Sequence, residues 1–159
     1  MAGERDRHVD LSWRRGSVGR VREWDIVIRE TASDTEVAAL RDALLEYNFE
    51  ATGYRDGKSL SCFLYDDGEL VGGIDGFTWG GYARIDYLWV AEPRRGGGLG
   101  SRLLAAAEEE ARRRGCSTVV LDTHSFQAPG LYRARGYTEI GTTTGTPRGH
   151  TQTLFQKSL

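Results

Sequence analysis

At residues 87–101 the chain reads YLWVAEPRRGGGLGS, in which an apolar, strand-like segment runs through a glycine-rich loop into a helix-forming segment. Four glycines within residues 96–100 exceed what a tight turn requires. Glycine lets the backbone curl so that several N–H groups point at one spot, and the following helix adds unsatisfied donors and the positive end of its dipole. The segment therefore predicts an anion site suited to phosphate, to which Arg94, Arg95 and Arg102 can add charged contacts.

Two other phosphate-binding motifs fit this loop less well. A P-loop requires Gly-Lys-Ser/Thr, whereas here Gly100 is followed by Ser101 and Arg102, which disfavours a nucleotide triphosphatase. A dinucleotide fingerprint follows the first strand of a βαβ unit and has a ribose-binding acid about 20 residues further on. Here the loop follows a predicted β-meander, and the next predicted strand ends in Asp122-Thr123-His124, which disfavours a dinucleotide site.

Composition and charge limit the classes of function. The chain has 159 residues, 39% of them apolar and 28% charged, which is typical of one globular domain. The formal net charge of −2 gives no field that would attract nucleic acid or an anionic membrane, so neither is expected as a partner. No apolar run approaches the ~20 residues of a membrane span, and residues 1–22 lack the apolar core of a secretory signal. We therefore expect a cytoplasmic protein with a flexible tail over residues 1–22 and a single domain over residues 23–159.

Metal and disulfide chemistry is not expected. Cys62 and Cys116 have neither metal-ligand spacing nor the pattern of a disulfide framework. His8, His124 and His150 also lack ligand spacing, so no metal site is predicted.

Hydrophobic periodicity and turn residues predict a mixed α/β arrangement, an α/β (α+β) fold class with one central sheet. A capping box at Ser33-Asp34-Thr35-Glu36 opens a helix over residues 34–47, and residues 48–58 form either a polar connection or a short second helix. The long helix after the glycine loop ends at Gly115. Its predicted buried stripe is Leu99, Leu103, Leu104, Ala107 and Ala111, and its predicted i,i+4 pairs are Glu108/Arg112, Glu109/Arg113 and Glu110/Arg114. A short helix begins at Pro129 and ends at Gly136. Strands are predicted over residues 24–29, 59–65, 69–79, 82–91, 118–122, 137–140 and 151–155, giving the order β-α-(α)-β-β-β-α-β-α-β-β.

Two blocks of this sequence resemble one family. Arg95-x-x-Gly98-x-Gly100, between a strand and a long helix, resembles the acetyl-CoA pyrophosphate loop of the GNAT superfamily of N-acyltransferases. Residues 128–137, APGLYRARGY, are similar to the superfamily's Ala-x-x-Leu/Phe-Tyr-x-x-x-Gly-Phe/Tyr element, and one helix and one strand separate the two blocks. Residues 121–128, LDTHSFQA, and Pro147-x-Gly149-His150-Thr151 resemble a bacterial subgroup of small GNAT enzymes. The resemblance implies a GNAT-like mixed sheet with helices on both faces.

The resemblance also implies acetyl-CoA as co-substrate and a set of residues that contact it. The backbone N–H near Val90, where the strand breaks and its neighbour splays away, would be the oxyanion donor. Ser125 takes the position of an asparagine that contacts the pantetheine arm in many members, and it is a shorter group. The implied cofactor-binding residues are Leu88, Trp89, Val90, Arg95, Gly96, Gly97, Gly98, Leu99, Gly100, Ser101, Ser125, Ala128 and Tyr132.

For catalysis, the resemblance assigns Tyr132 the role of proton donor to the leaving thiolate. The general base that deprotonates the incoming ammonium stays open among three residues, a water chain, or an acceptor whose amine is already neutral. Asp86 lies four residues before Val90 and shares its face if no bulge intervenes. Glu92 lies just past the strand end, and His124 follows the parallel strand at the sheet edge where ligands usually bind.

The acceptor is specified least. Trp79, Tyr82, Tyr87 and Trp89 on the meander, with Tyr47, Asn48, Glu50 and Tyr54 in the connection that the family uses as an acceptor wall, would suit a cationic amine. The first hypothesis is acetyl transfer to a primary amine of a small molecule. A protein or peptide acetyltransferase that modifies a lysine or an N-terminus is the second, and a CoA-binding module without turnover is the third. A homodimer is left open.

Overall fold

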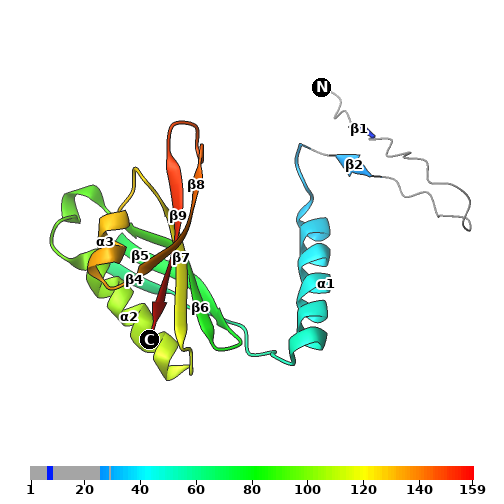
Figure 1. Cartoon of the computed structure of the whole chain (residues 1–159), viewed down its shortest axis with the longest axis horizontal. Helices are drawn as coiled ribbons and strands as arrows, with labels where there is room; N and C mark the ends of the chain where they lie inside the picture. The colour runs from blue at the N-terminus through cyan, green and yellow to red at the C-terminus, as the bar shows by residue number, and fades with distance from the viewer. Residues whose placement is uncertain (1–6, 9–25, 29) are drawn as a thin grey trace, which may run out of the picture. The chain divides into compact units, whose positions relative to one another are not determined.

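The computed structural model describes residues 7–8, 26–28 and 30–159 (Figure 1). The chain divides into two compact units, Met1–Ala51 and Thr52–Leu159. Of the tail predicted over residues 1–22, only β1 (Arg7–His8) lies within the described residues, so its predicted flexibility stays a prediction.

The N-terminal unit consists of a short strand pair and a helix. β1 pairs antiparallel with β2 (Val27–Ile28), which is the described part of the strand predicted over residues 24–29. α1 (Asp34–Thr52) begins at the predicted capping box, where the Ser33 hydroxyl oxygen accepts the Glu36 N–H at 3.2 Å. The helix continues past residue 47 and ends before Gly53, whose φ of +75° favours glycine. Of the segment 48–58, which the sequence left as a connection or a second helix, residues 48–52 therefore belong to α1 and residues 53–57 form a loop.

The C-terminal unit is built on one mixed sheet of seven strands. The strands are β3 (Lys58–Ser59), β4 (Cys62–Asp66), β5 (Glu69–Trp79), β6 (Tyr82–Val90), β7 (Thr118–His124), β8 (Thr138–Thr144) and β9 (Thr151–Ser158). Their order is β3-β5-β6-β7-β9-β8, with β4 also paired to β5. β6 and β7 run parallel, and the other described pairs of this sheet are antiparallel. The predicted mixed sheet is confirmed, although β7, β8 and β9 run further than expected and the strand predicted over residues 59–65 is divided into β3 and β4.

Helices connect the central strands and lie against the sheet. η1 (Glu92–Arg94) and α2 (Leu99–Arg113) form the crossover from β6 to β7, and α3 (Pro129–Ala134) follows β7 (Figure 1). α2 and α3 contribute to the same buried cluster and therefore cover the same face of the sheet. The expectation of a helix on the other face stays a prediction. Within the described residues, no helix has an apolar stretch suited to crossing a bilayer.

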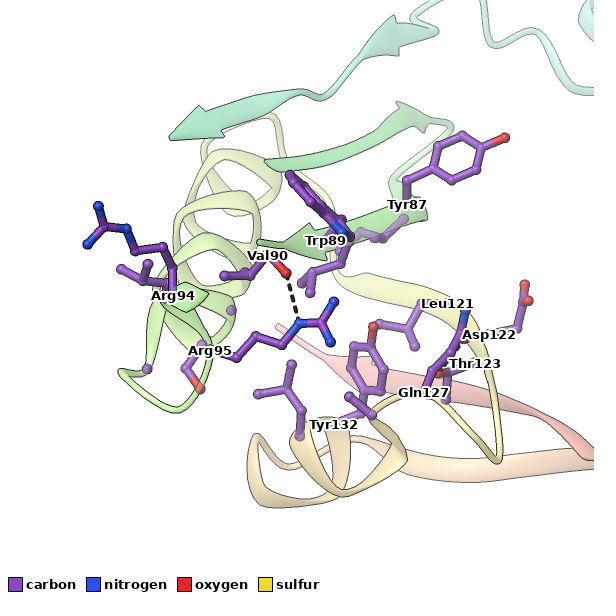
Figure 2. Close-up of a pocket in the computed structure, with 18 of the residues that line it drawn as sticks. Tyr87, Trp89, Val90, Arg94, Arg95, Leu121, Asp122, Thr123, Gln127 and Tyr132 are labelled. Atoms are coloured by element: carbon purple, nitrogen blue, oxygen red, sulfur yellow. Dashed lines mark hydrogen bonds between the residues drawn. The ribbon is translucent and has the colours of Figure 1, made fainter. Parts of the chain in front are cut away.

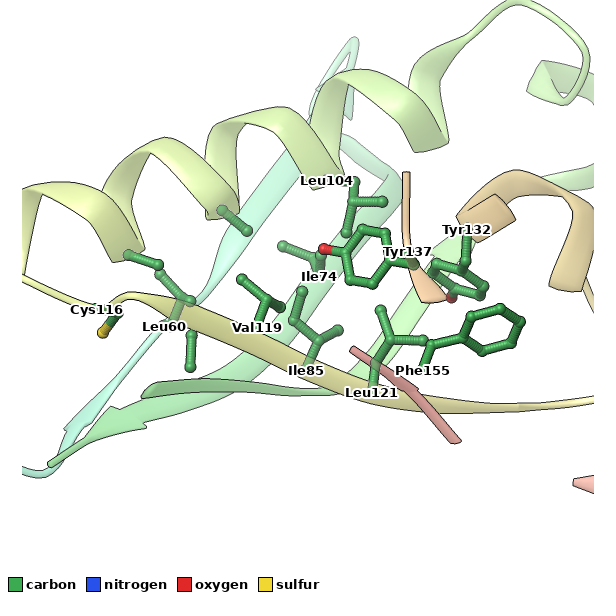
Figure 3. Packing of buried hydrophobic residues seen from close by; sticks show 13 residues of the cluster. Leu60, Ile74, Ile85, Leu104, Cys116, Val119, Leu121, Tyr132, Tyr137 and Phe155 are labelled. Carbon is green, nitrogen blue, oxygen red and sulfur yellow. The ribbon is translucent and has the colours of Figure 1, made fainter. Parts of the chain in front are cut away.

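The hydrophobic core lies between α2 and the sheet. Leu104, Ala107 and Ala111 form the buried stripe of α2, at the spacing that the sequence predicted. They pack against Ile74, Ile85, Val119, Leu121 and Phe155 from the four central strands, with Tyr132 and Tyr137 at the α3 end (Figure 3). This packing fixes the start of α2 relative to the ends of β6 and β7.

A buried carboxylate lies within this core and was not predicted. The Glu108 side chain is only 3% exposed, and Arg112 pairs with Glu109 rather than with Glu108 as predicted. Of the three predicted i,i+4 pairs, the one between Glu110 and Arg114 is present. The Tyr137 hydroxyl donates to Glu108 Oε1 at 3.1 Å, and Lys157 Nζ donates to Oε2 at 2.7 Å. Burial and then the Glu108 charge raise the pKa of Tyr137, so its hydroxyl remains a neutral donor. Glu108 thereby links α2 to the start of β8 and the end of β9, which lie side by side in the sheet.

Replacing Glu108 with alanine should lower the free energy of unfolding by about 3 kcal/mol, because it leaves the Lys157 ammonium and the Tyr137 hydroxyl without their buried partner. Denaturant unfolding measures the change. The matched control is Glu109→Ala on the exposed side of the same helix, where a change below about 0.5 kcal/mol is expected. Equal stability of the two variants would contradict the role of Glu108 as the buried partner of Lys157 and Tyr137.

Candidate functional site

The parallel strands β6 and β7 separate before either of them ends. Their pairing stops at Ile85 and Leu121, whereas the strands continue to Val90 and His124. The register between β5 and β6 shifts at the same point, which leaves Asp86 as the extra residue of a β-bulge. A bulge bends its strand and increases the local twist, so β6 turns away from β7 and a split opens between them.

Gly76 makes this bulge possible. A Cβ atom at residue 76 would lie 2.0 Å from the backbone oxygen of Arg84, which no side chain allows. Because the bulge is present, the spacing of four residues between Asp86 and Val90 does not define a shared face of the strand. The expectation that Asp86 shares the face of Val90 depended on the absence of a bulge, and that condition is not met.

A cavity of about 770 Å³ occupies the split (Figure 2). It is bounded by the end of β6, the glycine loop, the first turn of α2, the end of β7 and α3. The predicted cofactor-binding residues that line it are Leu88, Trp89, Val90, Arg95, Gly96, Gly98, Leu99, Gly100, Ser101, Ala128 and Tyr132. Gly97 and Ser125 do not line it. The two sequence blocks, separated by a helix and a strand, therefore meet at one cavity.

The glycine loop presents a run of backbone donors. Gly96 and Gly98 have φ values of +80° and +79°, and added Cβ atoms at these two residues would meet no neighbouring atom within 4 Å. The backbone N–H groups of residues 96–101 donate to no other group in the part of the chain that the structure describes. The first helical hydrogen bond is that from the Arg102 N–H to the Gly98 carbonyl. Free amides at a helix start, with an open surface above them, suit a phosphate or diphosphate group.

The arginines of the loop are engaged elsewhere in this structure. Arg94 forms an ion pair with Asp66 at the β4–β5 turn. Arg95 extends into the split, where its Nε donates to the Val90 carbonyl oxygen at 2.9 Å (Figure 2). A phosphate contact by Arg95 would therefore require its guanidinium to leave that carbonyl.

The Val90 N–H faces the split. The Ala91 N–H donates to the Val71 carbonyl at 2.9 Å, and residues of an antiparallel strand alternate between bonding to one neighbour and to the other. Val90 therefore directs its N–H away from β5, toward the side from which β7 has diverged. This is the donor position that the resemblance implied for an oxyanion.

Tyr132 lies on α3 with its hydroxyl directed into the cavity (Figure 2). Its ring packs against the rings of Phe155 and Tyr137, with centroid distances of 5.7 and 5.9 Å. The hydroxyl makes no hydrogen bond to any described residue of the chain. Burial, and to a lesser extent the charge of Asp122, raise the pKa of Tyr132, so the phenol stays protonated. It is a fixed proton or hydrogen-bond donor that faces open space.

Of the three candidate bases, only Asp86 lines the cavity. Its carboxylate accepts a hydrogen bond from Arg84 Nε at 2.9 Å. Glu92 lies in η1 outside the lining, and His124 stacks on Phe126 with ring centroids 5.1 Å apart. The identity of the base stays a prediction, and geometry favours Asp86.

A polar chain beside the split was missed by the sequence reasoning. Arg84 Nη2 donates to Asp122 Oδ1 at 2.7 Å, and Gln152 Nε2 donates to Asp122 Oδ2 at 2.5 Å. Partial burial opposes the charge of Arg84, but the hydrogen bonds and charges of Asp86 and Asp122 outweigh it, and the pKa of Arg84 is raised. The pair of Arg84 and Asp86 could have been found from the sequence, because these residues are two apart on one predicted strand. The contact with Asp122 could not, because Asp122 is distant in sequence. The chain of hydrogen bonds holds the carboxylates of Asp86 and Asp122 in place beside the split.

The predicted acceptor aromatics divide into two groups. Tyr87 and Trp89 line the cavity, with 72% and 49% of their surfaces exposed. Trp79 instead donates from its indole N–H to the Tyr54 carbonyl at 3.0 Å, and Tyr82 packs edge-on against Trp79. Tyr47, Asn48 and Glu50 belong to the N-terminal unit.

No cluster of His, Cys, Asp and Glu among the described residues is arranged to hold a metal ion.

Comparison with known proteins gives a consistent result. The model of the acetyltransferase (GNAT) family matches residues 21–137. An acetyltransferase of Agrobacterium fabrum is 35% identical over 134 residues, which cover 84% of this chain and 98% of that protein. Blasticidin-S acetyltransferase of Streptomyces morookaense is 37% identical over 131 residues, which cover 82% of this chain and 95% of that protein. A crystal structure of an acetyltransferase from Bacillus cereus superimposes with a TM-score of 0.72 at 32% identity, covering 82% of this chain and 96% of that chain.

The cavity at a split between parallel strands, the glycine loop and these similarities define the class: the chain belongs to the GNAT family of acetyltransferases and is an acyltransferase enzyme.

Replacing Gly76 with alanine should lower the free energy of unfolding by about 3 kcal/mol, because the added methyl group forces β5 away from the Arg84 backbone at the bulge. Denaturant unfolding compares it with Gly130→Ala, where the Cβ meets nothing and the helical position favours alanine. The control should be as stable as the native chain or slightly more so. A Gly76→Ala variant of native stability would show that the bulge does not depend on this contact.

Proposed function

We propose that this enzyme transfers an acetyl group from acetyl-CoA to a primary amine of a small molecule, by direct attack of the amine on the thioester. The observation that carries the proposal is the set of unpaired amides at residues 96–101, placed at the mouth of the cavity between β6 and β7. They provide a site for the diphosphate of CoA, from which the pantetheine arm reaches along the split toward Val90 and Tyr132.

The residues at the inner end of the split match the chemistry of the transfer. The amine nitrogen forms a bond to the thioester carbon, and the carbonyl oxygen becomes an oxyanion. The Val90 N–H is placed to stabilise this charge, and one such preorganised donor contributes about 3 kcal/mol to lowering the barrier. As the oxyanion returns to a carbonyl, the C–S bond breaks, the nitrogen loses its extra proton to solvent, and the thiolate receives a proton or a hydrogen bond.

Tyr132 is the donor to the leaving thiolate in this proposal. A free phenol has a pKa of about 10 and a thiol about 8.5, so full proton transfer is already slightly unfavourable. Burial raises the pKa of Tyr132 further, which shifts the balance toward a strong hydrogen bond rather than complete transfer. A proton from solvent can then neutralise the thiolate after Tyr132 has stabilised it.

Asp86 is the proposed base for the acceptor ammonium, either directly or through a water molecule. Its carboxylate lines the cavity, while Arg84 holds its orientation. The exposed rings of Tyr87 and Trp89 lie on the same strand and suit the approach of a cation. The similarity to blasticidin-S acetyltransferase supports a small acceptor rather than a protein.

Gly98→Glu should weaken acetyl-CoA binding at least a hundredfold, because a carboxylate would stand where the diphosphate is held. Isothermal titration calorimetry measures the affinity. Gly115→Glu is the matched control, since Gly115 has nearly the same backbone conformation, with φ +80° against +79°, and equally open space around its Cβ. Both variants should lose similar stability, and only the first should lose binding. Unchanged affinity in Gly98→Glu would refute the phosphate site.

Tyr132→Phe should lower kcat by one to three orders of magnitude, the range for a lost acid catalyst, with little change in the Kd for acetyl-CoA. Tyr137→Phe is the control, because that tyrosine is also buried on the same side of the core but does not line the cavity. It should lose stability and keep its turnover. Full turnover in Tyr132→Phe would remove Tyr132 from the mechanism.

The acceptor class is tested by thiol release from acetyl-CoA over a panel that contains blasticidin S, simple primary amines, and peptides with a lysine or a free N-terminus. The proposal predicts release with small amines. Release with peptides alone would indicate a protein acetyltransferase, and binding of acetyl-CoA without release on any amine would indicate a CoA-binding module.

A further inference from the structure

The turn between β7 and α3 carries two polar side chains near the cavity, and Ser125 is turned away from it. The Ser125 N–H donates to the Thr151 carbonyl at 2.8 Å, and its hydroxyl oxygen accepts the Thr151 N–H at 3.3 Å. The same hydroxyl lies 3.4 Å from Nδ1 of His150. Ser125 is therefore engaged in fixing the β8–β9 connection to the end of β7, and it does not line the cavity.

Gln127 lies on the cavity side of the same turn. Its Oε1 accepts the backbone N–H of His124 at 2.8 Å and the hydroxyl of Thr123 at 3.0 Å. Because a backbone N–H can only donate, this network assigns the oxygen of the side-chain amide and thereby also its nitrogen. The amide is held from one end, and the position of Nε2 follows from that of Oε1.

Nε2 of Gln127 remains as an available donor. It makes no hydrogen bond to another described residue, and Gln127 contributes to the cavity lining. In Figure 2 its side chain stands with Thr123 and Tyr132 on the β7–α3 side of the cavity, across from β6. The neighbouring wall residues Phe126, Ala128 and Leu131 are apolar, so Gln127 and Tyr132 supply the side-chain donors of this wall.

We propose that Gln127 donates a hydrogen bond through Nε2 to a carbonyl oxygen of the acyl-pantetheine arm, the contact that the resemblance implied for Ser125; this inference rests on the proposed function. The arm of acetyl-CoA contains two amide carbonyls and the thioester carbonyl, and each of them is an acceptor that needs a partner when it leaves water. The Gln127 amide nitrogen provides such a partner, because the hydrogen bonds to Oε1 already hold the side chain in place.

Two variants separate this contact from the support that Gln127 gives to the turn. Gln127→Glu keeps an oxygen that can accept the His124 N–H and the Thr123 hydroxyl, but replaces the donor nitrogen with a second acceptor. Gln127→Met has a similar length and removes both functions. Ser125→Ala is the matched control from the same turn. Each is titrated with acetyl-CoA and with 3′-phosphoadenosine 5′-diphosphate, the nucleotide part of CoA that lacks the arm, and thermal unfolding checks the fold.

Both Gln127 variants should bind acetyl-CoA about tenfold more weakly, as expected for the loss of one hydrogen bond to a neutral group, and bind the nucleotide part within twofold of the native chain. Ser125→Ala should bind both probes as the native chain does. The assignment is overturned if Gln127→Glu binds acetyl-CoA normally, if both probes weaken by the same factor, or if Ser125→Ala alone shows the arm-specific loss. A native chain that binds neither probe would instead overturn the proposed function, and this inference with it.

Discussion

The separation of β6 from β7 is the constraint on which the site depends. The strands pair only as far as Ile85 and Leu121, and the bulge at Asp86 turns β6 aside while the core continues beneath it. Backbone groups that would normally pair between neighbouring strands then face a cavity. In this structure the Val90 carbonyl is satisfied by Arg95, while the N–H of the same residue faces the open side. The split therefore supplies both the space and the unpaired backbone that a thioester would need.

The rigid parts of the unit hold that opening in position. α2 is anchored by its apolar stripe and by Glu108, so its first turn and the glycine loop are fixed relative to the strand ends. Tyr132 is held by aromatic packing from β9 and from Tyr137, which itself bonds to Glu108. One buried carboxylate thus connects the helix that begins at the glycine loop with Tyr137 and, through the packing of Tyr137, with Tyr132 in the cavity wall. Both carboxylate oxygens of Glu108 accept a hydrogen bond, as a buried charge requires.

Much of the fold and part of the site could be predicted from the sequence, because those features are local. The glycine loop, the α2 stripe and the capping box at Ser33 depend on spacing within a few residues, and the structure has each of them. The bulge depends on Gly76 meeting the Arg84 backbone across a strand pair, which no spacing along one segment reveals. The same reason applies to the burial of Glu108, to the Arg84–Asp122 pair and to the orientation of Ser125. Residues that contact partners distant in sequence could be named as candidates, but their orientations could not be predicted.

Amide hydrogen exchange with and without saturating acetyl-CoA tests the central claim most directly, because it reports on the backbone donors themselves. The account predicts strong new protection at residues 96–101 and at Val90, where N–H groups without partners would acquire acceptors. Exchange at the far end of α2 and in β8 should change little, since these segments lie away from the cavity lining. Bound acetyl-CoA with unchanged exchange over residues 96–101 would contradict the account.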